Sequence, residues 1–444
     1  MRNNKEAEEL LKFIDESPSC FHAVNNITYV LEQKGFERLE ERNKWDIKEG
    51  GKYFVTRNDS AVVAFTIPRK EYKGFMISAS HSDSPSFKIK ENTEIEALGN
   101  YVKLNVEKYG GMLCAPWFDR PLSVAGRVII KDYNSNNRFV DSPKNSIGLV
   151  QKLVCVDRDL LMIPSLAIHM NREANSGYKY NVQDDMLPVL SCGGKKGTFK
   201  AIIAEAAGVK EEDILSTDLF LYNRVKGTFW GADNEFIASS KLDDLECAWT
   251  CLQGFVNSSN EENATVYCVF DNEEVGSETR QGADSTFLND VLRRINAGCG
   301  RSEEEYYTSL AMSFMVSADN AHAVHPNYSN VADPVNRPVI NKGPVIKFNA
   351  AQKYCTDSIS AGLFKSVCDN AGVPYQTFTN RSDMAGGSTL GNISESHVSI
   401  SSVDIGIAQW AMHSPYESAG AEDVGLMIKA MTEFYGSDWN LERI

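Results

Sequence analysis

The chain has 444 residues, of which 42% are hydrophobic and 24% charged, as in an ordinary globular protein and unlike a disordered or fibrous chain. Acidic residues outnumber basic ones by 60 to 45, and the formal net charge of -15 argues against a nucleic-acid binder or a polybasic membrane protein. No apolar run approaches the roughly 18 residues that a membrane helix needs. The first nine residues lack the apolar core of a signal peptide, and the ten cysteines form no CxxC pair, so we expect a cytoplasmic protein with reduced thiols.

The amino-terminal part combines helix and strand signals. Apolar residues at 10–14 share one face and predict a helix that ends at Ser17-Pro18, and a second amphipathic helix follows through residues 21–31. Strand-like runs come next at 53–56, 61–67 and 75–80. The last run is apolar on both faces, which is typical of a strand that is covered on both sides.

The sequence pattern changes between about residues 93 and 232, where short β-rich pieces such as 123–130 lie among Gly, Pro and Asn turn signals. Strands and helices alternate again from residue 236, with strands at 264–270 and 344–348 and a final helix near 422–435. This alternation predicts an α/β fold with a mainly parallel sheet flanked by helices. The simplest architecture is one α/β domain formed by residues 1–92 and 233–444, with a β-rich insertion at 93–232.

Side chains that bind metals follow or border predicted strands at five places. In an open α/β sheet, binding sites form at the carboxyl ends of the strands, so these five pieces are expected to converge. Each piece is weak alone, because a lone histidine is more often structural and paired acids often cap a helix. The pieces are His81 with Asp83, Asp243 with Asp244, Glu273 with Glu274, Asp319, and His413, which follows a strand-like run at 405–412.

Two of the pairs have a spacing that suits metal chemistry. His81 and Asp83 are two residues apart, so in an extended chain they point to the same side. Asp83 can then hold the imidazole nitrogen that does not bind the metal. Glu273 and Glu274 are adjacent acids, so one can bind a metal while the other accepts a proton from an activated water.

Charge counting suggests how many metal ions such a site holds. If the ligands are His81, His413, Asp243, Glu274 and Asp319, the three carboxylates leave a net negative charge around one divalent ion. Two divalent ions leave one positive charge, which a bridging hydroxide neutralises. Nitrogen and oxygen ligands without cysteine favour Zn²⁺, with Mn²⁺ or Co²⁺ as alternatives.

At these residues the chain resembles the aspartyl aminopeptidase family, a group of di-metal aminopeptidases that includes the yeast vacuolar aminopeptidase. The matching segments come in the family's order and extend over nearly the whole chain. They are SHSDSP (80–85), KLDDL (241–245), FDNEEVGS (270–277), SADNAHAVHPNY (317–328), GPVIK (343–347) and AMHS (411–414).

The resemblance implies a zinc-peptidase-like fold and a role for each metal-binding residue. Asp243 is then the ligand that bridges the two ions. His81 and Asp319 complete one metal site, and Glu274 and His413 complete the other.

Two further roles concern proton transfer and ligand orientation. By the same resemblance, Glu273 is the general base and the later proton donor to the leaving amine. Asp83 orients His81.

The insertion at 93–232 resembles the family's dimerisation domain. Its segment IPSLAIHM (163–170) matches one whose histidine reaches the active site of a neighbouring subunit, which implies this role for His169. A histidine buried in the core is the alternative. Because family members form tetrahedral dodecamers, the resemblance also implies a homododecamer.

Lys347 matches the lysine that gives the family its preference for Asp or Glu as the first residue, whereas without the resemblance a surface lysine at a strand end is the simpler interpretation. The implied activity is a metal-dependent aminopeptidase that acts on peptides, with no nucleic-acid or membrane partner. A neutral first-residue preference and a di-metal amidase of small acylated amino acids are the alternatives. A scaffold with purely structural metals is disfavoured, because Glu273 is not needed as a ligand.

The sequence departs from the family pattern at two places. Leu-Asp-Asp at 242–244 replaces the Leu-Asp-Asn of many relatives and adds a carboxylate, Asp244, near the metals. The Gly-rich segment 380–391 differs in its small residues. We expect neither departure to contact a proposed ligand.

Overall fold

The computed structural model describes residues 4–131 and 148–438, which divide into two compact units. Unit 1 comprises residues 4–84, 227–412 and 417–438, and unit 2 comprises residues 85–131, 148–226 and 413–416. Both ends of the chain thus build unit 1. The catalytic role predicted for residues 1–92 and 233–444 and the dimerisation role predicted for 93–232 stay predictions.

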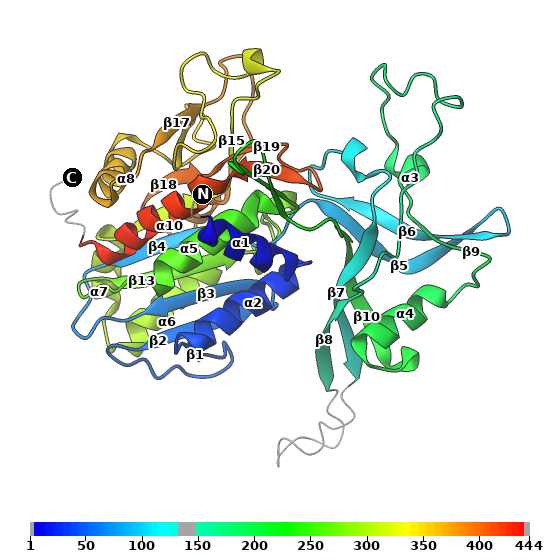
Figure 1. Cartoon of the computed structure of the whole chain (residues 1–444). Helices are drawn as coiled ribbons and strands as arrows, with labels where there is room; N and C mark the ends of the chain where they lie inside the picture. Colours follow the sequence, from blue (N-terminus) through cyan, green and yellow to red (C-terminus); the bar gives the residue numbers. More distant parts are fainter. Residues whose placement is uncertain (1–3, 132–147, 439–444) are drawn as a thin grey trace. The chain divides into compact units, whose positions relative to one another are not determined.

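Unit 1 contains a nine-stranded sheet in the order β1-β2-β3-β13-β4-β14-β18-β16-β17. Five of its eight strand pairings are parallel, including those that join β13, β4, β14 and β18 in the middle (Figure 1). The predicted α/β fold with a mainly parallel sheet is therefore confirmed. The strands are β1 (Glu37–Arg38), β2 (Lys52–Arg57), β3 (Ala61–Thr66), β4 (Phe75–His81), β13 (Ala264–Phe270), β14 (Phe314–Ala318), β16 (Val345–Phe348), β17 (Gln376–Thr379) and β18 (Ser401–Gly406).

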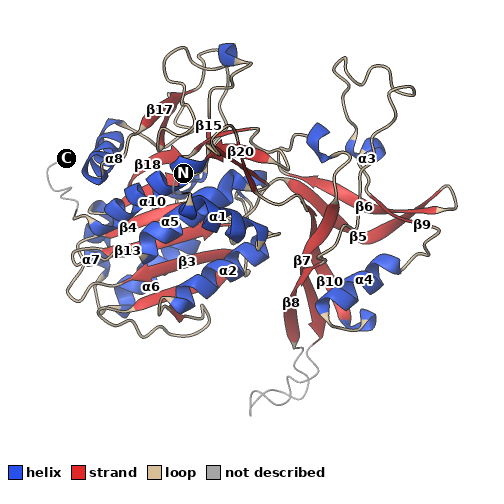
Figure 2. Cartoon of the chain, in the orientation of Figure 1, coloured by secondary structure: helices blue, strands red, loops and turns tan. Residues whose placement is uncertain are grey.

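Helices cover both faces of this sheet (Figure 2). Side chains alternate along each strand, so Val62 and Ala64 of β3 pack on one face while Val63 and Phe65 pack on the other. The first face is covered by α1 (Lys5–Asp15), α2 (Cys20–Gln33), α5 (Leu242–Val256), α8 (Ser358–Ala371) and α10 (Ala421–Gly436). The second face is covered by α6 (Phe287–Gly298), α7 (Glu303–Ala311) and α9 (Leu390–Glu395).

A second sheet of unit 1 has the order β11-β12-β20-β19-β15. The single strand-like run that we predicted at 405–412 is wrong, because β18 ends at Gly406 and β19 belongs to this second sheet. Gly406 marks the break: a Cβ there would lie 2.0 Å from the carbonyl oxygen of Asp319, so only glycine permits the close approach. The strands are β11 (Thr228–Trp230), β12 (Phe236–Ser239), β15 (Ala321–His322), β19 (Ala408–Trp410) and β20 (Glu417–Gly420).

Unit 2 is built on a six-stranded antiparallel sheet in the order β8-β7-β10-β5-β6-β9. Phe199 and Ile203 of α4 (Thr198–Ala207) pack into a core with strand residues such as Phe87 and Leu219, and the short helix α3 spans Val182–Asp185. The strands are β5 (Ser86–Ala97), β6 (Tyr101–Tyr109), β7 (Leu122–Lys131), β8 (Leu149–Cys155), β9 (Val189–Cys192) and β10 (Ile214–Asn223). Among the described residues of the whole chain, no helix has both the length and the apolar character needed to cross a bilayer.

Candidate active site

The predicted metal ligands of unit 1 gather where three neighbouring parallel strands end. His81 is the last residue of β4, Asp319 directly follows β14, and the short helix η4 (Glu273–Val275) begins three residues after β13. Because β13, β4 and β14 are adjacent and parallel, their carboxyl ends lie at one edge of the sheet. Asp243 joins them from the start of α5, where the backbone is not yet helical.

The ligand atoms are close enough to share metal ions. One atom from each of His81, Asp243, Asp244 and Asp319 lies within 4.8 Å of the other three, and all four residues are buried. Atoms of His81, Glu273 and Glu274 form a second such group. These donors are imidazole nitrogen and carboxylate oxygen, the set that Zn²⁺, Mn²⁺ and Co²⁺ accept. The residues present therefore fit a site for divalent metal ions.

Hydrogen bonding fixes which nitrogen of His81 can bind a metal. Nδ1 lies 3.1 Å from the backbone carbonyl oxygen of Asp83 and 3.4 Å from its carboxylate. A carbonyl oxygen only accepts, so Nδ1 carries a hydrogen, and the neutral imidazole that would bind a metal has its lone pair on Nε2. Nε2 lies 3.5 Å from Oδ1 of Asp243, so this lone pair is on the side of the predicted bridging ligand.

Asp83 also fixes the segment that holds the two glutamates. Its Oδ1 accepts the backbone N–H of Glu273 at 3.1 Å, and its Oδ2 accepts that of Glu274 at 3.2 Å. One carboxylate thus holds two successive amides as well as facing the imidazole. Sequence reasoning anticipated the imidazole contact but not these two hydrogen bonds.

The buried acidic side chains of the site make ionisation of their neighbours less favourable. Burial raises the pKa of Glu273 to about 8, and Asp319, Asp83 and Asp243 nearby add to the shift. Burial likewise raises the pKa of Asp319, although Lys347 opposes the shift, and it raises that of Asp244 well above its usual value. Such a concentration of buried carboxylates is costly without cations. Divalent ions would offset this repulsion.

Lys347 is buried beside the ligand Asp319. Its Nζ donates to the backbone carbonyls of Asp319 at 2.8 Å and Asn320 at 3.3 Å, and it lies 3.9 Å from the Asp319 carboxylate. The residue is only 2% exposed, so the alternative of a surface lysine is wrong. Its ammonium group is adjacent to the predicted metal site.

The sequence did not reveal the supporting contacts of two carboxylates. Oδ2 of Asp244 accepts the backbone N–H of His81 at 3.0 Å, so the expectation that this departure contacts no proposed ligand was wrong. Oε2 of Glu417 accepts the backbone N–H of Asp243 at 3.1 Å. The first contact joins residues that are 163 positions apart in the chain, and the second joins residues 174 positions apart. No local sequence pattern predicts either contact.

The other two predicted site residues belong to unit 2. Nδ1 of His413 lies 2.8 Å from the carbonyl oxygen of Gly111, so it carries the hydrogen and Nε2 carries the lone pair that could bind a metal. His169 is exposed in the segment between β8 and β9, so the alternative of a core histidine is wrong. Their roles as metal ligand and as contact to a neighbouring subunit stay predictions.

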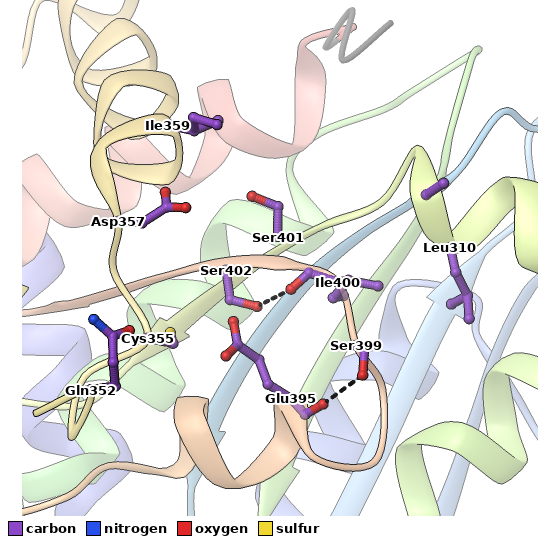
Figure 3. Close-up of a pocket in the computed structure, with 11 residues that line it drawn as sticks. Leu310, Gln352, Cys355, Asp357, Ile359, Glu395, Ser399, Ile400, Ser401 and Ser402 are labelled. Atoms are coloured by element: carbon purple, nitrogen blue, oxygen red, sulfur yellow. Dashed lines mark hydrogen bonds between the residues drawn. The ribbon is translucent and has the colours of Figure 1, made fainter. Parts of the chain in front are cut away.

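A cavity of about 590 Å³ in unit 1, shown in Figure 3, has none of these residues in its lining. It is lined by the start of β18, including Ser401 and Ser402, and by Asp357 and Glu395, where burial raises the pKa of Glu395 to about 7. Ser401 pairs with Phe314, the first residue of the parallel strand β14, so the cavity is at the amino end of these strands. The cluster around His81 lies at the carboxyl ends, where sites in this fold class form.

Comparison with known proteins identifies the family. A family model described as aminopeptidase I zinc metalloprotease (M18) matches residues 13–435. A probable M18 family aminopeptidase 2 of Clostridium acetobutylicum is 47% identical, over 98% of this chain and 100% of the relative. A protein of the same description from Ectopseudomonas mendocina is 40% identical, over 96% of this chain and 97% of the relative.

Solved structures are similar to this chain over nearly its whole length. The chain of a cryo-EM structure of an Ape4 and Nbr1 complex has a TM-score of 0.92 and 34% identity, over 97% of this chain and 86% of that one. The Saccharomyces cerevisiae mApe1 dodecamer has a TM-score of 0.83 and 26% identity, over 98% of this chain and 97% of that one. Fold and sequence together define a metallopeptidase. The chain belongs to the M18 family of aminopeptidases, and it is a metallo-aminopeptidase that hydrolyses peptide bonds.

Proposed function

We propose that this aminopeptidase holds two divalent metal ions, with Zn²⁺ favoured and Mn²⁺ or Co²⁺ as alternatives. His81 and Asp319 would hold one ion, Glu274 and His413 would hold the other, and Asp243 would contribute to both. The main support is the set of buried donor atoms of His81, Asp243 and Asp319, which lie within 4.8 Å of one another. Bound ions would supply a lowered water pKa and stabilise the charge that develops on the scissile carbonyl oxygen.

The protein's own contribution to the chemistry is proton transfer by Glu273. This carboxylate takes a proton from the attacking water as the water oxygen bonds to the scissile carbonyl carbon. It then delivers the proton to the leaving amine as the carbon–nitrogen bond breaks. The backbone N–H of Glu273 is held by Asp83, which also faces Nδ1 of His81, so base and ligand are positioned by one residue.

We further propose that Lys347 gives a preference for Asp or Glu as the first residue. An ammonium group has three N–H donors, and the carbonyls of Asp319 and Asn320 accept from two of them. A substrate carboxylate at contact distance would interact strongly in this buried environment. The chain's net charge of -15 would oppose an acidic substrate only weakly, because salt screens it beyond about 8 Å.

The test is a panel of Asp-, Glu- and Leu-arylamides, assayed with metal-reconstituted protein and with Lys347→Ala. We expect the parent to favour Asp and Glu, and the variant to lose most of this preference. Because Lys347 also contacts Asp319, the ratio of acidic to neutral rates is the decisive quantity, with metal content measured in parallel. The same ratio in both proteins would contradict the role of Lys347.

Two alternative activities are separated by the same assay. A parent enzyme that hydrolyses the Leu-arylamide best is an aminopeptidase of neutral preference. An amidase of small acylated amino acids would cleave N-acetylated substrates as well as free ones, whereas an aminopeptidase requires the free amine. Measuring each arylamide with and without the acetyl group distinguishes these cases.

We also propose that the protein forms a tetrahedral homododecamer in the cytoplasm, with the insertion at 93–232 as the dimerisation domain and peptides as the substrates. The S. cerevisiae relative is described as a dodecamer. In unit 2, Leu166, Ile168 and Met170 beside His169 are 58%, 48% and 75% exposed, which suits a contact with another chain. His169 would then reach the active site of the neighbouring subunit.

A further inference from the structure

A long loop of unit 1 exposes apolar side chains that have no role in the site. The loop spans residues 323–343, between β15 and β16, and carries the short helix η5 (Ser329–Val331). It is the yellow segment that projects beyond the labels β15 and β17 in Figure 1. Tyr328, Val331, Val335 and Val339 are 61%, 48%, 82% and 43% exposed. The exposed part of this loop is therefore rich in apolar side chains, and we call residues 323–343 the 323–343 surface.

Hydrogen bonds to the strand β17 and to Arg381, which lies just after that strand, hold the loop in place. Gln376 makes two bonds to the backbone of Val339, accepting from its N–H at 2.8 Å and donating to its carbonyl at 2.9 Å. The Thr377 hydroxyl donates to Oδ1 of Asn336 at 3.1 Å, and Arg381 donates to the carbonyl of Asn330. These bonds hold the loop at Asn330, Asn336 and Val339, so little backbone conformational entropy would be lost on binding.

The surface also carries little charge. Asp333, Arg337 and Lys342 are the charged residues among the 21 of the loop, whereas 24% of the whole chain is charged. Two copies of a chain with a net charge of -15 repel each other, least where the local charge is low or positive. One acid and two bases make this loop a favourable place for a second copy to approach.

We propose that the 323–343 surface is a contact between copies of this chain, separate from the contact formed by the exposed segment around His169. This inference rests on the dodecamer proposed above. A closed assembly of twelve identical chains needs more than one kind of contact, because a single two-fold contact stops at the dimer. The segment around His169 supplies one contact, and the 323–343 surface supplies another.

The experiment compares Tyr328→Glu and Val335→Glu with the parent and with Tyr29→Glu by native mass spectrometry. Tyr29 is a matched control, because it lies on α2 of the same unit and is also 61% exposed. Each loop variant is expected to convert the dodecamer into dimers at micromolar concentration, while Tyr29→Glu stays dodecameric. Circular dichroism and thermal unfolding confirm that each variant is folded.

The outcomes separate this inference from the proposal on which it rests. A parent that is not a dodecamer overturns the assembly itself. A dodecameric parent whose two loop variants also stay dodecameric overturns the role of the 323–343 surface alone. Dissociation of Tyr29→Glu to the same extent also overturns it, since any added charge would then suffice. If a loop variant fails to fold, the other variant decides.

Discussion

Two regions of the chain have unusual burial: one buries carboxylates, and the other exposes apolar side chains. At the ends of β4, β13 and β14, unit 1 buries Asp243, Asp244 and Asp319, although carboxylates are rarely buried without partners. In unit 2, the segment around His169 exposes Leu166 and Met170, although such side chains are usually inside. The first region needs positive charge, and the second needs apolar cover.

The contrast shows how a single chain can indicate what it binds. Buried carboxylates with imidazole beside them indicate cations, because cations remove the repulsion that burial creates. Exposed apolar side chains indicate another protein surface, because contact removes them from water. Each region is explained by an occupant of opposite chemistry, and the following experiments test the two explanations separately.

The largest effect is expected from metal removal. A chelator should abolish arylamide hydrolysis and lower the thermal stability, because the carboxylates around His81 lose their counter-charge. Free metal at a thousand times its dissociation constant stabilises a folded protein by about 4 kcal/mol, which sets the scale of the loss. Activity and melting temperature are measured alongside metal content, with Zn²⁺-saturated chelator as the control. Full activity in metal-free protein would exclude the metal explanation of the first region.

The next largest effect is expected from Glu273→Gln. Loss of a general base lowers kcat by roughly 10²- to 10⁴-fold. Metal content should be unchanged, because the proposed ligand is the neighbouring Glu274. Steady-state kinetics and elemental analysis on the same sample check both points. An active variant with its full complement of metal would remove Glu273 from the mechanism.

A smaller effect, about 10²-fold, is expected from His169→Ala, on the scale of removing one hydrogen-bond donor that stabilises the transition state. The assembly should persist, because the apolar side chains around His169 remain. Mixing this variant with Glu273→Gln chains should restore activity, since mixed assemblies pair an intact Glu273 with a neighbour's intact His169. Native mass spectrometry confirms that mixed assemblies form. If they form without recovery of activity, His169 does not act across subunits.

The smallest effect is expected from Asp244→Asn. The new side chain keeps an oxygen that can accept the N–H of His81, so kcat/KM should fall by about tenfold at most. Removing one buried carboxylate lessens the repulsion in the metal-free protein. The difference in melting temperature between metal-loaded and metal-free protein should therefore shrink relative to the parent. An unchanged difference would show that Asp244 does not contribute to the charge of the cluster.

Much of the fold could be predicted because it depends on local patterns. The strand at residues 264–270 was predicted with the bounds that β13 has, and alternating strands and helices gave the parallel centre of the sheet. The convergence of His81, Glu273 and Asp319 followed from one rule, that ligands gather at the carboxyl ends of such strands. The run at 405–412 failed because periodicity cannot show that Gly406 meets the backbone of Asp319.

The supporting contacts of the site could not be predicted in this way. The hydrogen bonds from Glu273 and Glu274 to Asp83 join residues about 190 positions apart, and the bond from Asp243 reaches Glu417 across 174. Periodicity and spacing describe neighbours in the chain, whereas these pairs depend on how loops from separate strands meet. The burial of Lys347 could not be predicted either, because a lysine at a strand end suggests a surface position.

The double role of Asp83 determines how the site responds to small displacements. Its backbone carbonyl and carboxylate face one imidazole, while the same carboxylate holds two successive amides of another loop. If the loop that carries Asp83 is displaced, its contacts with the imidazole and with both glutamate amides change at once. A small displacement at Asp83 would therefore alter the geometry of the proposed metal ligand and of the proposed base together.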